Sequence, residues 1–192
     1  GNAIFEHAYA SEMPAPFLSA VIDDCVERGT DYNAGGARYN TSFVQCVGIG
    51  SITDSLSAIN ARVYRENALD MGSLLRLLAD DFEGHEAERL MLASSPRYGN
   101  DDDAADDIMR AVFEMLYREI DERPNSRGGA YHIDMLPTTS HIYFGSVMGA
   151  SADGRHSGRP LSEGISPVQG ADTHGPTAVL ASAAKMDHVR TC

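Results

Sequence analysis

Residues 35–59 read GGARYNTSFVQCVGIGSITDSLSAI and contain a loop, a strand, a turn and a helix in that order. The paired glycines and polar side chains of residues 35–40 show no periodicity, which predicts a loop. Residues 43–47 form a short apolar run of β-prone side chains and predict a strand. The glycines in residues 48–50 predict a turn that leads into a helix. A short apolar strand followed by a turn and a helix is typical of an α/β fold.

Amphipathic helices are predicted on both sides of this unit. The helix after the turn is expected to be capped by Ser51 or Thr53, because a hydroxyl oxygen can accept a hydrogen bond from a free N–H group of the first helical turn. Upstream, residues 17–26 have helical spacing, and Gly29 follows as a C-cap. Downstream helices are expected over residues 71–82, 85–93 and 101–120 and after Pro176, the third with an apolar stripe of Ile108, Val112, Met115, Leu116 and Ile120.

The last third of the chain changes character. Residues 130–135 and 140–147 are rich in β-prone side chains and predict two strands, one on each side of the sequence Leu-Pro-Thr-Thr at residues 136–139. Glycines then recur between residues 145 and 175 without a fixed period. A segment of this kind becomes ordered by packing against its surroundings. These patterns together predict the α/β fold class.

Composition and charge limit the partners of the chain. Of its 192 residues 43% are hydrophobic, which is enough to bury a core. The formal net charge of −13 argues against binding to nucleic acid or to an anionic membrane, because both need a basic face. No apolar stretch approaches the roughly 20 residues of a membrane span, and the N-terminus lacks a signal-peptide pattern. We therefore expect small molecules or other proteins as partners, and a cytoplasmic location.

Cysteines and histidines give no sign of a disulfide or a metal site. Cys25, Cys46 and Cys192 are an odd number without CxxC spacing, and reduced thiols fit the cytoplasm. None of the seven histidines is paired with another at i and i+4, so no zinc site is expected. Ser140 and His141 are neighbours in a predicted strand, where side chains alternate between faces, and they therefore do not predict a hydrolase triad.

Two further patterns resemble known motifs but have local explanations. Residues 47–53, VGIGSIT, lie between a strand and a helix as a dinucleotide fingerprint would, yet Thr53 stands where that motif needs a third glycine. A plain turn between strand and helix is the favoured interpretation. Asp102, Asp103 and Asp106 match the DDxxD pattern of magnesium–diphosphate sites. They also open a predicted helix, where the helix dipole favours acidic side chains, and this interpretation is preferred.

Five segments together resemble the later part of the pyruvate formate-lyase-like domain of glycyl radical enzymes. Within that superfamily, the sequences of residues 35–59 and of the LPTTSHIYFG segment look most like those of the dehydratases of trans-4-hydroxy-L-proline. The alternatives are another radical lyase of the same scaffold, such as a formate acetyltransferase, a glycerol or diol dehydratase or a choline lyase, and a non-catalytic remnant or binding module. The matching segments are residues 35–40, 47–59, 97–103, 135–155 and 160–188.

The resemblance implies the architecture of the whole enzyme. Glycyl radical enzymes enclose their reaction site in a barrel of ten strands, made of two five-stranded halves and wrapped by helices. Residues 1–192 would form part of the second half, as a partial pyruvate formate-lyase-like domain that is truncated at both ends and lacks the glycine radical domain. We expect such a segment to be inactive alone, although its parent is an enzyme.

The resemblance also implies the chemistry and the partners of the parent. A partner activating enzyme, which uses S-adenosylmethionine and an iron–sulfur cluster, makes a radical on a backbone glycine. The radical passes to a cysteine, whose thiyl form takes hydrogen from a small-molecule substrate, and in the dehydratases a nearby carboxylate assists the loss of water. A buried site shields these intermediates. No cofactor is expected to bind this chain directly. The expected partners are the substrate, the activating enzyme and the remainder of the parent chain, which is expected to form a homodimer.

Neither radical-bearing position can be carried over to this sequence. The thiyl cysteine is expected in a GCVE-like loop, with the catalytic glutamate two residues later, and the glycyl radical in an RVxGY-like segment that is absent here. The sequences around the three cysteines are DDCVERG, VQCVG and RTC. Cys25 precedes Val26 and Glu27, but Asp24 replaces the glycine, and we interpret Cys25 as a small buried thiol within a helix. No catalytic residue is therefore assigned.

Part of a pocket wall can be carried over. The resemblance implies that the LPTT strand passes the substrate, so that Thr138 and Thr139 offer hydroxyl groups to it, with strand alternation leaving one of them facing inward. The alternative is that both hydroxyls only satisfy neighbouring groups. Arg38, Tyr39 and Asn40 are expected to form scaffold near the site rather than to act in catalysis.

Overall fold

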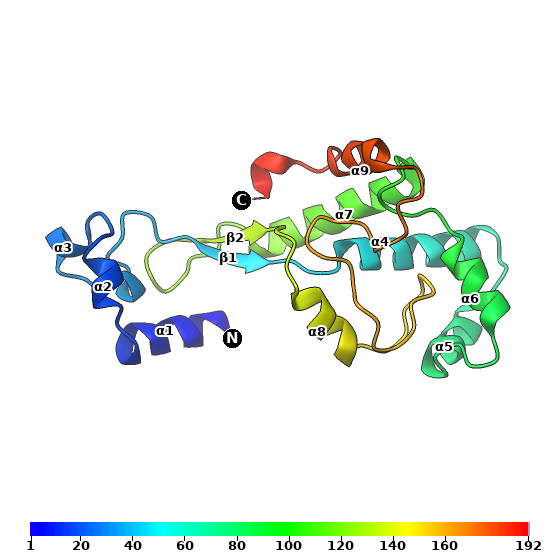
Figure 1. The fold of residues 1–192 in the computed structure, drawn as a ribbon, viewed down its shortest axis with the longest axis horizontal. Helices are drawn as coiled ribbons and strands as arrows, with labels where there is room; N and C mark the ends of the chain where they lie inside the picture. The colour runs from blue at the N-terminus through cyan, green and yellow to red at the C-terminus, as the bar shows by residue number, and fades with distance from the viewer. Residues whose placement is uncertain (192) are drawn as a thin grey trace. The chain divides into compact units, whose positions relative to one another are not determined.

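A computed structural model describes residues 1–191, which fall into two compact units (Figure 1). The first unit contains residues 1–44 and 117–133. The second unit contains residues 45–116 and 134–191. Because both units are built from separated stretches of sequence, each depends on contacts between segments far apart in the chain.

Short helices open the first unit, and the prediction of a single helix over residues 17–26 is wrong. This stretch is interrupted because Asp24 has a φ of 74°, a left-handed conformation that cannot continue a right-handed helix. Gly29 is the C-cap of the last short helix, as expected. The elements are α1 (Asn2–Glu12), α2 (Pro16–Ser19), α3 (Cys25–Arg28) and the 3-10 helix η1 (Tyr32–Ala34).

Two strands form the sheet, β1 (Ser42–Gln45) and β2 (Tyr131–Asp134), close to the predicted positions. The backbone N–H of Ser42 donates to the carbonyl of Ala130 at 3.0 Å, and that of Cys46 donates to the carbonyl of Asp134 at 2.9 Å. From the first of these hydrogen bonds to the second, the residue number rises by four in both strands, so the strands run parallel.

Helices dominate the second unit, and those expected near residues 71–82, 85–93, 101–120 and after Pro176 are confirmed. Of the helices in residues 1–191, none is long and apolar enough to cross a membrane. The elements are α4 (Ile49–Ala58), the π-helix η2 (Ile59–Arg65), α5 (Met71–Ala79), α6 (Glu86–Ala93), α7 (Asp103–Ile120), which continues into the first unit, α8 (Ser140–Val147), α9 (Pro176–Ala183) and the 3-10 helix η3 (His188–Arg190).

The expected cap of α4 is wrong. Gly48, with a φ of 90°, is the N-cap, and Ser51 and Thr53 lie inside the helix, where both are buried. Glycine adopts this left-handed conformation without steric cost, so the chain turns sharply from β1 into the helix. The two hydroxyl side chains are therefore free to serve contacts with other segments.

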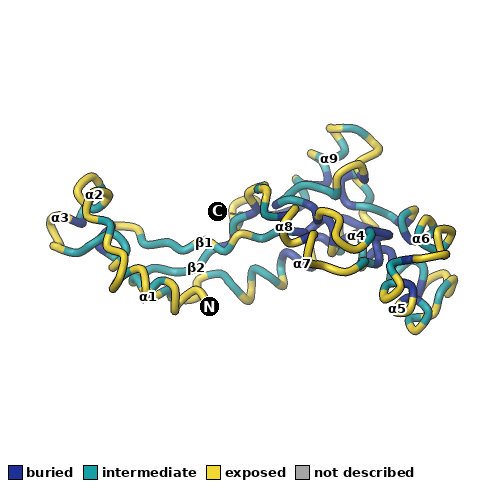
Figure 2. The backbone as a smooth tube through the Cα atoms, turned by 60° about the horizontal axis from the view of Figure 1, so that its bottom comes forward, coloured by how far each residue is buried: buried dark blue, intermediate teal, exposed yellow. Residues whose placement is uncertain are grey.

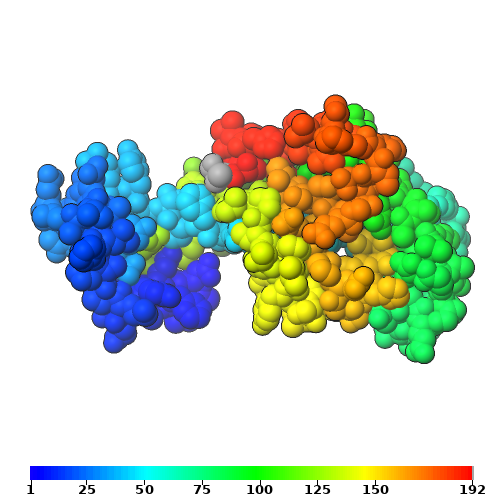
Figure 3. All heavy atoms as spheres, viewed as in Figure 1, coloured from blue at the N-terminus to red at the C-terminus, as the bar shows by residue number. Residues whose placement is uncertain are grey.

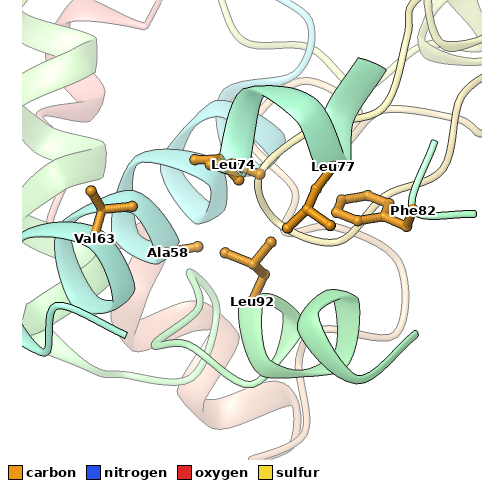
Figure 4. Packing of buried hydrophobic residues seen from close by; sticks show 7 residues of the cluster. Ala58, Val63, Leu74, Leu77, Phe82 and Leu92 are labelled. Carbon is orange, nitrogen blue, oxygen red and sulfur yellow. The ribbon is translucent and has the colours of Figure 1, made fainter. Parts of the chain in front are cut away.

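An apolar cluster forms the core between α4, η2, α5 and α6 (Figure 4). Figure 4 shows Leu77 and Phe82 pointing toward each other beside Leu92. Leu74 and Leu92 are 1% and 0% exposed, and the burial of each side chain stabilises the fold by about 1.5–3 kcal/mol. Dark blue tube marks buried stretches of α4 in Figure 2, whereas α1 has no buried residue.

The buried face of α7 differs from the predicted stripe. Val112 is buried as expected, but Met115 is 57% exposed. Some side chains that α7 buries are smaller than the predicted ones, and others lie one position away from them. The buried face of a helix depends on the segments that cover it as well as on the helix itself. These buried residues are Ala105, Asp106, Met109, Val112 and Phe113.

Residues 140–147 form the helix α8, so the strand expected there is wrong. The β-prone side chains are overridden by packing, because Gly145 lies against the backbone of residues 159–161. A Cβ atom at Gly145 would lie 2.4 Å from the carbonyl oxygen of Arg159. Most apolar side chains of α8 remain exposed, and Figure 3 shows this segment in yellow at the surface. They are Ile142, Tyr143, Phe144 and Val147, followed by Met148.

Candidate functional site

Thr138 and Thr139 lie in a turn that joins β2 to α8, so the expected strand alternation does not apply to them. The Oγ1 atom of Thr138, which is partly buried, lies 2.5 Å from the Oγ of Ser140. Thr139 is the exposed N-cap residue of α8, and its hydroxyl makes no hydrogen bond within residues 1–191. The two hydroxyls therefore differ. One already has a neighbouring partner, and the other is available.

Residues 161–165 hold this turn in place. The N–H of Leu161 donates to the carbonyl of His141 at 3.3 Å, and the N–H of Ile165 donates to that of Met135 at 2.9 Å. Gly164, at a φ of 44°, lies so close that a Cβ atom there would be 2.4 Å from the carbonyl oxygen of Met135. The turn is thus fixed at both ends by a segment that follows it by about 20–30 residues.

His141 adjoins this turn, and the sequence prediction did not single it out. Its side chain is buried, and its Nδ1 lies 2.6 Å from the carbonyl oxygen of Thr138 and 3.8 Å from a carboxylate oxygen of Glu163. With a proton on Nδ1, the ring donates to Thr138 and holds the turn from inside. The strand prediction concealed this role, because only a helix starting at Ser140 folds His141 back toward residue 138. Ser140 bonds to Thr138 and so has no place in a hydrolase triad with His141.

Arg38, Tyr39 and Asn40 belong to the first unit, whereas the two threonines belong to the second. Arg38 binds both carboxylate oxygens of Asp24, at 2.7 and 3.1 Å, and this contact holds the pKa of Asp24 below its usual value. The side-chain amide of Asn40 donates to two carbonyls of its own loop, at 2.9 and 3.1 Å. Tyr39 is 84% exposed. Arg38 and Asn40 thus hold the loop, and Tyr39 extends from it.

The glycine pair at residues 35 and 36 has a packing role. A Cβ atom on Gly36 would lie 2.0 Å from the carbonyl oxygen of Thr30. One on Gly35, whose φ is 89°, would lie 2.5 Å from the carbonyl oxygen of Arg127. These positions admit only glycine, so the loop of residues 35–40 closes tightly on its surroundings.

Of the cysteines within the described residues, Cys25 is buried and Cys46 is partly buried. Cys25 is 2% exposed and opens α3, which agrees with its interpretation as a buried thiol, although it begins a helix instead of lying inside one. Cys46 is partly buried, and burial together with the nearby charge of Asp134 raises the pKa of its thiol. A raised pKa disfavours the thiolate. Cys192 lies outside the described residues.

The α4 N-terminus is engaged by the protein itself. The backbone N–H of Ser51 donates to the Oγ of Ser162 at 3.2 Å, and the N–H of Ser162 donates to the Oγ of Ser51 at 2.8 Å. A Cβ atom at Gly50 would lie 3.0 Å from the carbonyl oxygen of Ser166. Where a dinucleotide fingerprint would receive a pyrophosphate, this chain therefore packs its own segment 162–166.

The DDxxD pattern surrounds a lysine. The ammonium group of Lys185 lies 2.8 Å from Asp103 and 2.7 Å from the buried Asp106, and hydrogen bonds to these carboxylates raise its pKa. Ser182 donates to the same oxygen of Asp106 at 2.9 Å. These bonds tie α9 and the residues after it to the start of α7, in line with the structural interpretation of the pattern.

Comparisons with known proteins identify the family. Residues 1–145 match the family model described as pyruvate formate lyase-like, and residues 161–191 match the one described as glycine radical. The chain belongs to the pyruvate formate lyase-like family of glycyl radical enzymes. It is 55% identical over 192 residues to the trans-4-hydroxy-L-proline dehydratase of Clostridioides difficile, and 35% identical over 191 residues to the (2S)-3-sulfopropanediol dehydratase of Klebsiella oxytoca.

Solved structures agree with these relatives. The crystal structure of hydroxyproline dehydratase from Clostridioides difficile, with trans-4-hydroxy-L-proline bound, matches 99% of this chain with a TM-score of 0.94 and 54% identity. The glycerol-bound form of the B12-independent glycerol dehydratase from Clostridium butyricum matches 98% with a TM-score of 0.92 and 39% identity. The chain spans 24% of each of these proteins, and 24% and 23% of the two relatives named above.

The glycine radical match changes the expected domain division. A single partial domain over residues 1–192, without a glycine radical domain, was expected from the sequence. The match over residues 161–191 assigns this last stretch to the glycine radical family model instead. Residues 161–165, which hold the turn at Thr138 and Thr139, therefore lie at the beginning of the glycine radical match. The turn itself lies within the pyruvate formate lyase-like match.

Proposed function

We propose that this chain is a segment of a radical dehydratase that eliminates water from trans-4-hydroxy-L-proline or a similar small hydroxylated substrate. The observation that carries the proposal is the level of identity. It is 55% across the whole chain with the hydroxyproline dehydratase, against 35% with the sulfopropanediol dehydratase. The structural likeness to the hydroxyproline-bound enzyme, with a TM-score of 0.94, supports the same substrate class.

In this proposal the complete protein performs the chemistry, in the cytoplasm and as a homodimer. An activating enzyme that uses S-adenosylmethionine and an iron–sulfur cluster makes the glycyl radical, which passes to a cysteine. The thiyl sulfur takes a hydrogen atom from a substrate carbon, a carboxylate assists the departure of the hydroxyl group as water, and the sulfur then returns the hydrogen atom. We assign none of these three catalytic residues to the present chain. The chain contributes α/β scaffold to a ten-stranded barrel.

The turn of residues 136–139 is the proposed substrate contact of this chain. The free hydroxyl of Thr139 has unused hydrogen-bonding capacity, and that of Thr138 can accept a further bond beside Ser140. His141 acts as a positioning residue, since its ring bonds to the backbone of Thr138. Arg38, Tyr39 and Asn40 remain proposed scaffold, in keeping with the bonds of Arg38 and Asn40 inside their own unit.

The test uses the full-length protein that contains this chain, activated without oxygen and assayed against hydroxyproline, glycerol and choline. Hydroxyproline is expected to be the substrate consumed with the highest kcat/KM. Thr138→Val and Thr139→Val are each made, and loss of a substrate hydrogen bond lowers kcat/KM by about tenfold. Thr177→Val, at an exposed position of α9, serves as the matched control.

Two results would contradict the proposal. Consumption of glycerol or choline in place of hydroxyproline would reassign the protein to another radical lyase of the same scaffold. Absence of any turnover, together with absence of a glycyl radical signal by electron paramagnetic resonance after activation, would favour a non-catalytic remnant. If the wild type consumes hydroxyproline and both threonine variants keep its full activity, the dehydratase proposal stands and the proposed contact is wrong.

A further inference from the structure

An open hollow of about 650 Å³ in the second unit is lined by four arginines. It lies between α6 and the segment of residues 153–169. We call it the arginine pocket, and the residues that define it are Arg89, Arg97, Arg155, Arg159, His156 and Asp153.

The charge of this pocket is opposite to that of the chain. The whole sequence has 28 acidic against 15 basic residues and a net charge of −13. The lining, in contrast, has four guanidinium groups and a single carboxylate, that of Asp153. This carboxylate is 2% exposed, and one of its oxygens accepts a hydrogen bond from Ser151 at 2.5 Å. Positive charges that gather in one hollow repel each other, and an anion placed between them relieves this repulsion.

Two of the arginines are held by several bonds within the protein. Arg155 is buried and donates to three backbone carbonyls. Arg89 forms an ion pair with Glu86 and donates to the carbonyl of residue 154. Both hold the glycine-containing segment around residue 154 in shape, and so they build the wall of the pocket.

The other two arginines have donors to spare. Arg97 donates through one terminal nitrogen to the carbonyl of Asp153, and its Nε lies 4.0 Å from Asp54. The guanidinium group of Arg159 is exposed and makes no hydrogen bond or ion pair with any residue in the described range 1–191. A guanidinium group offers five N–H donors in a fork that fits the oxygens of phosphate or carboxylate.

We propose that the arginine pocket binds a phosphate-bearing small molecule, with Arg159 and Arg97 as its ligands. Arg159 has no partner in the described residues and Arg97 keeps unused N–H donors, and two guanidinium groups in one pocket favour a dianion over a single carboxylate. The volume lies within the range of about 300–1,000 Å³ that is typical of small-molecule pockets, so it admits more than a free phosphate ion. The proposed dehydration consumes no phosphate. The pocket would therefore serve a second ligand, and its test needs no radical.

The test is calorimetric titration of inorganic phosphate into the full-length protein, not activated, at constant ionic strength. Phosphate is expected to bind, and Arg159→Gln to raise its Kd by about tenfold or more because the fork is lost. Arg159→Lys keeps the charge without the fork, and a rise of about threefold is expected. Arg65→Gln is the matched control, because Arg65 is also exposed and without a partner in the described residues. Its Kd should change by less than about twofold.

The outcomes separate this site from simple charge effects. Acetate, titrated in the same way, is expected to bind at least about tenfold more weakly than phosphate. Equal affinity for both, or the same loss in Arg159→Gln and Arg65→Gln, would indicate general charge attraction and overturn the proposal. Absence of phosphate binding to the folded wild-type protein would overturn it as well. Because dehydratase activity plays no part in the titration, failure here leaves the proposed function untouched.

Discussion

Asp54 is a carboxylate buried inside α4 with incomplete hydrogen bonding. It is 1% exposed, and one oxygen accepts from the backbone N–H of Tyr98 at 2.9 Å while the other has no hydrogen bond. Burial raises the pKa of Asp54 to about 7, an effect that this hydrogen bond and the charge of Arg97 only partly offset. Below about pH 7 the protonated form of Asp54 therefore predominates in the folded state.

The consequence is a loss of stability as pH rises from about 4 to about 7. In this range the folded protein keeps a proton on Asp54 that the unfolded chain releases, so the free energy of unfolding falls by up to about 1.4 kcal/mol per pH unit. Asp54→Asn, which cannot ionise, should remove this part of the slope. Urea unfolding at about pH 5 and about pH 7 measures it. Asp107→Asn at an exposed position is the control. An equal slope in the wild type and in Asp54→Asn would disprove the assignment.

Gly164 fixes the proposed substrate turn by close backbone contact. A Cβ atom there would lie 2.4 Å from the carbonyl oxygen of Met135 and 2.6 Å from the nitrogen of Pro137. Gly164→Ala is expected to cost about 1–3 kcal/mol through overpacking, in addition to about 1 kcal/mol for the left-handed backbone. Gly170→Ala is the matched control. Gly170 has a φ of 79° with no atom within 4 Å, so only the second cost applies. Unfolding midpoints compare the two, and equal losses would mean that the contact at residue 164 is soft.

At the level of elements, regular patterns were predictable and long-range constraints were not. The helices α5, α6 and α9 are predictable because apolar spacing, glycines and a proline mark them within their own sequence. The helix α8 was missed because its apolar side chains lie all around it, and its geometry depends on Gly145 packing against a segment that follows later. Local composition carries no sign of that contact.

The same limit applied to the candidate site. The LPTT sequence indicates Thr138 and Thr139, but the turn in which they lie and their unequal hydroxyl bonding follow from α8. His141 was overlooked, because a strand would point its ring away from residue 138 whereas a helical turn brings Nδ1 to 2.6 Å from the carbonyl of Thr138. A proline followed by Thr-Thr-Ser is a possible helix start, and this was the signal available in the sequence.

At the scale of the whole molecule, α8 exposes an apolar surface that a soluble protein usually covers. Tyr143 and Val147 are each 67% exposed, and the rings of Tyr143 and Phe144 contact each other edge to face at 5.7 Å between centroids. A helix that is apolar on all sides is typical of the interior of a larger protein. The named relatives are about four times as long as this chain, so in the full-length protein we expect other segments to cover α8.

The 192-residue chain alone is therefore expected to self-associate through α8. Attraction between apolar faces opposes the repulsion that a net charge of −13 produces, and salt screens only the repulsion. Sedimentation velocity should show larger species as sodium chloride rises from about 20 mM to about 0.5 M, where the screening length falls well below about 10 Å. Tyr143→Lys combined with Phe144→Lys should reverse the effect. Leu180→Lys, at a 70% exposed position of α9, controls for added charge. A chain that stays monomeric in high salt and unfolds in one cooperative step would instead be an independent module.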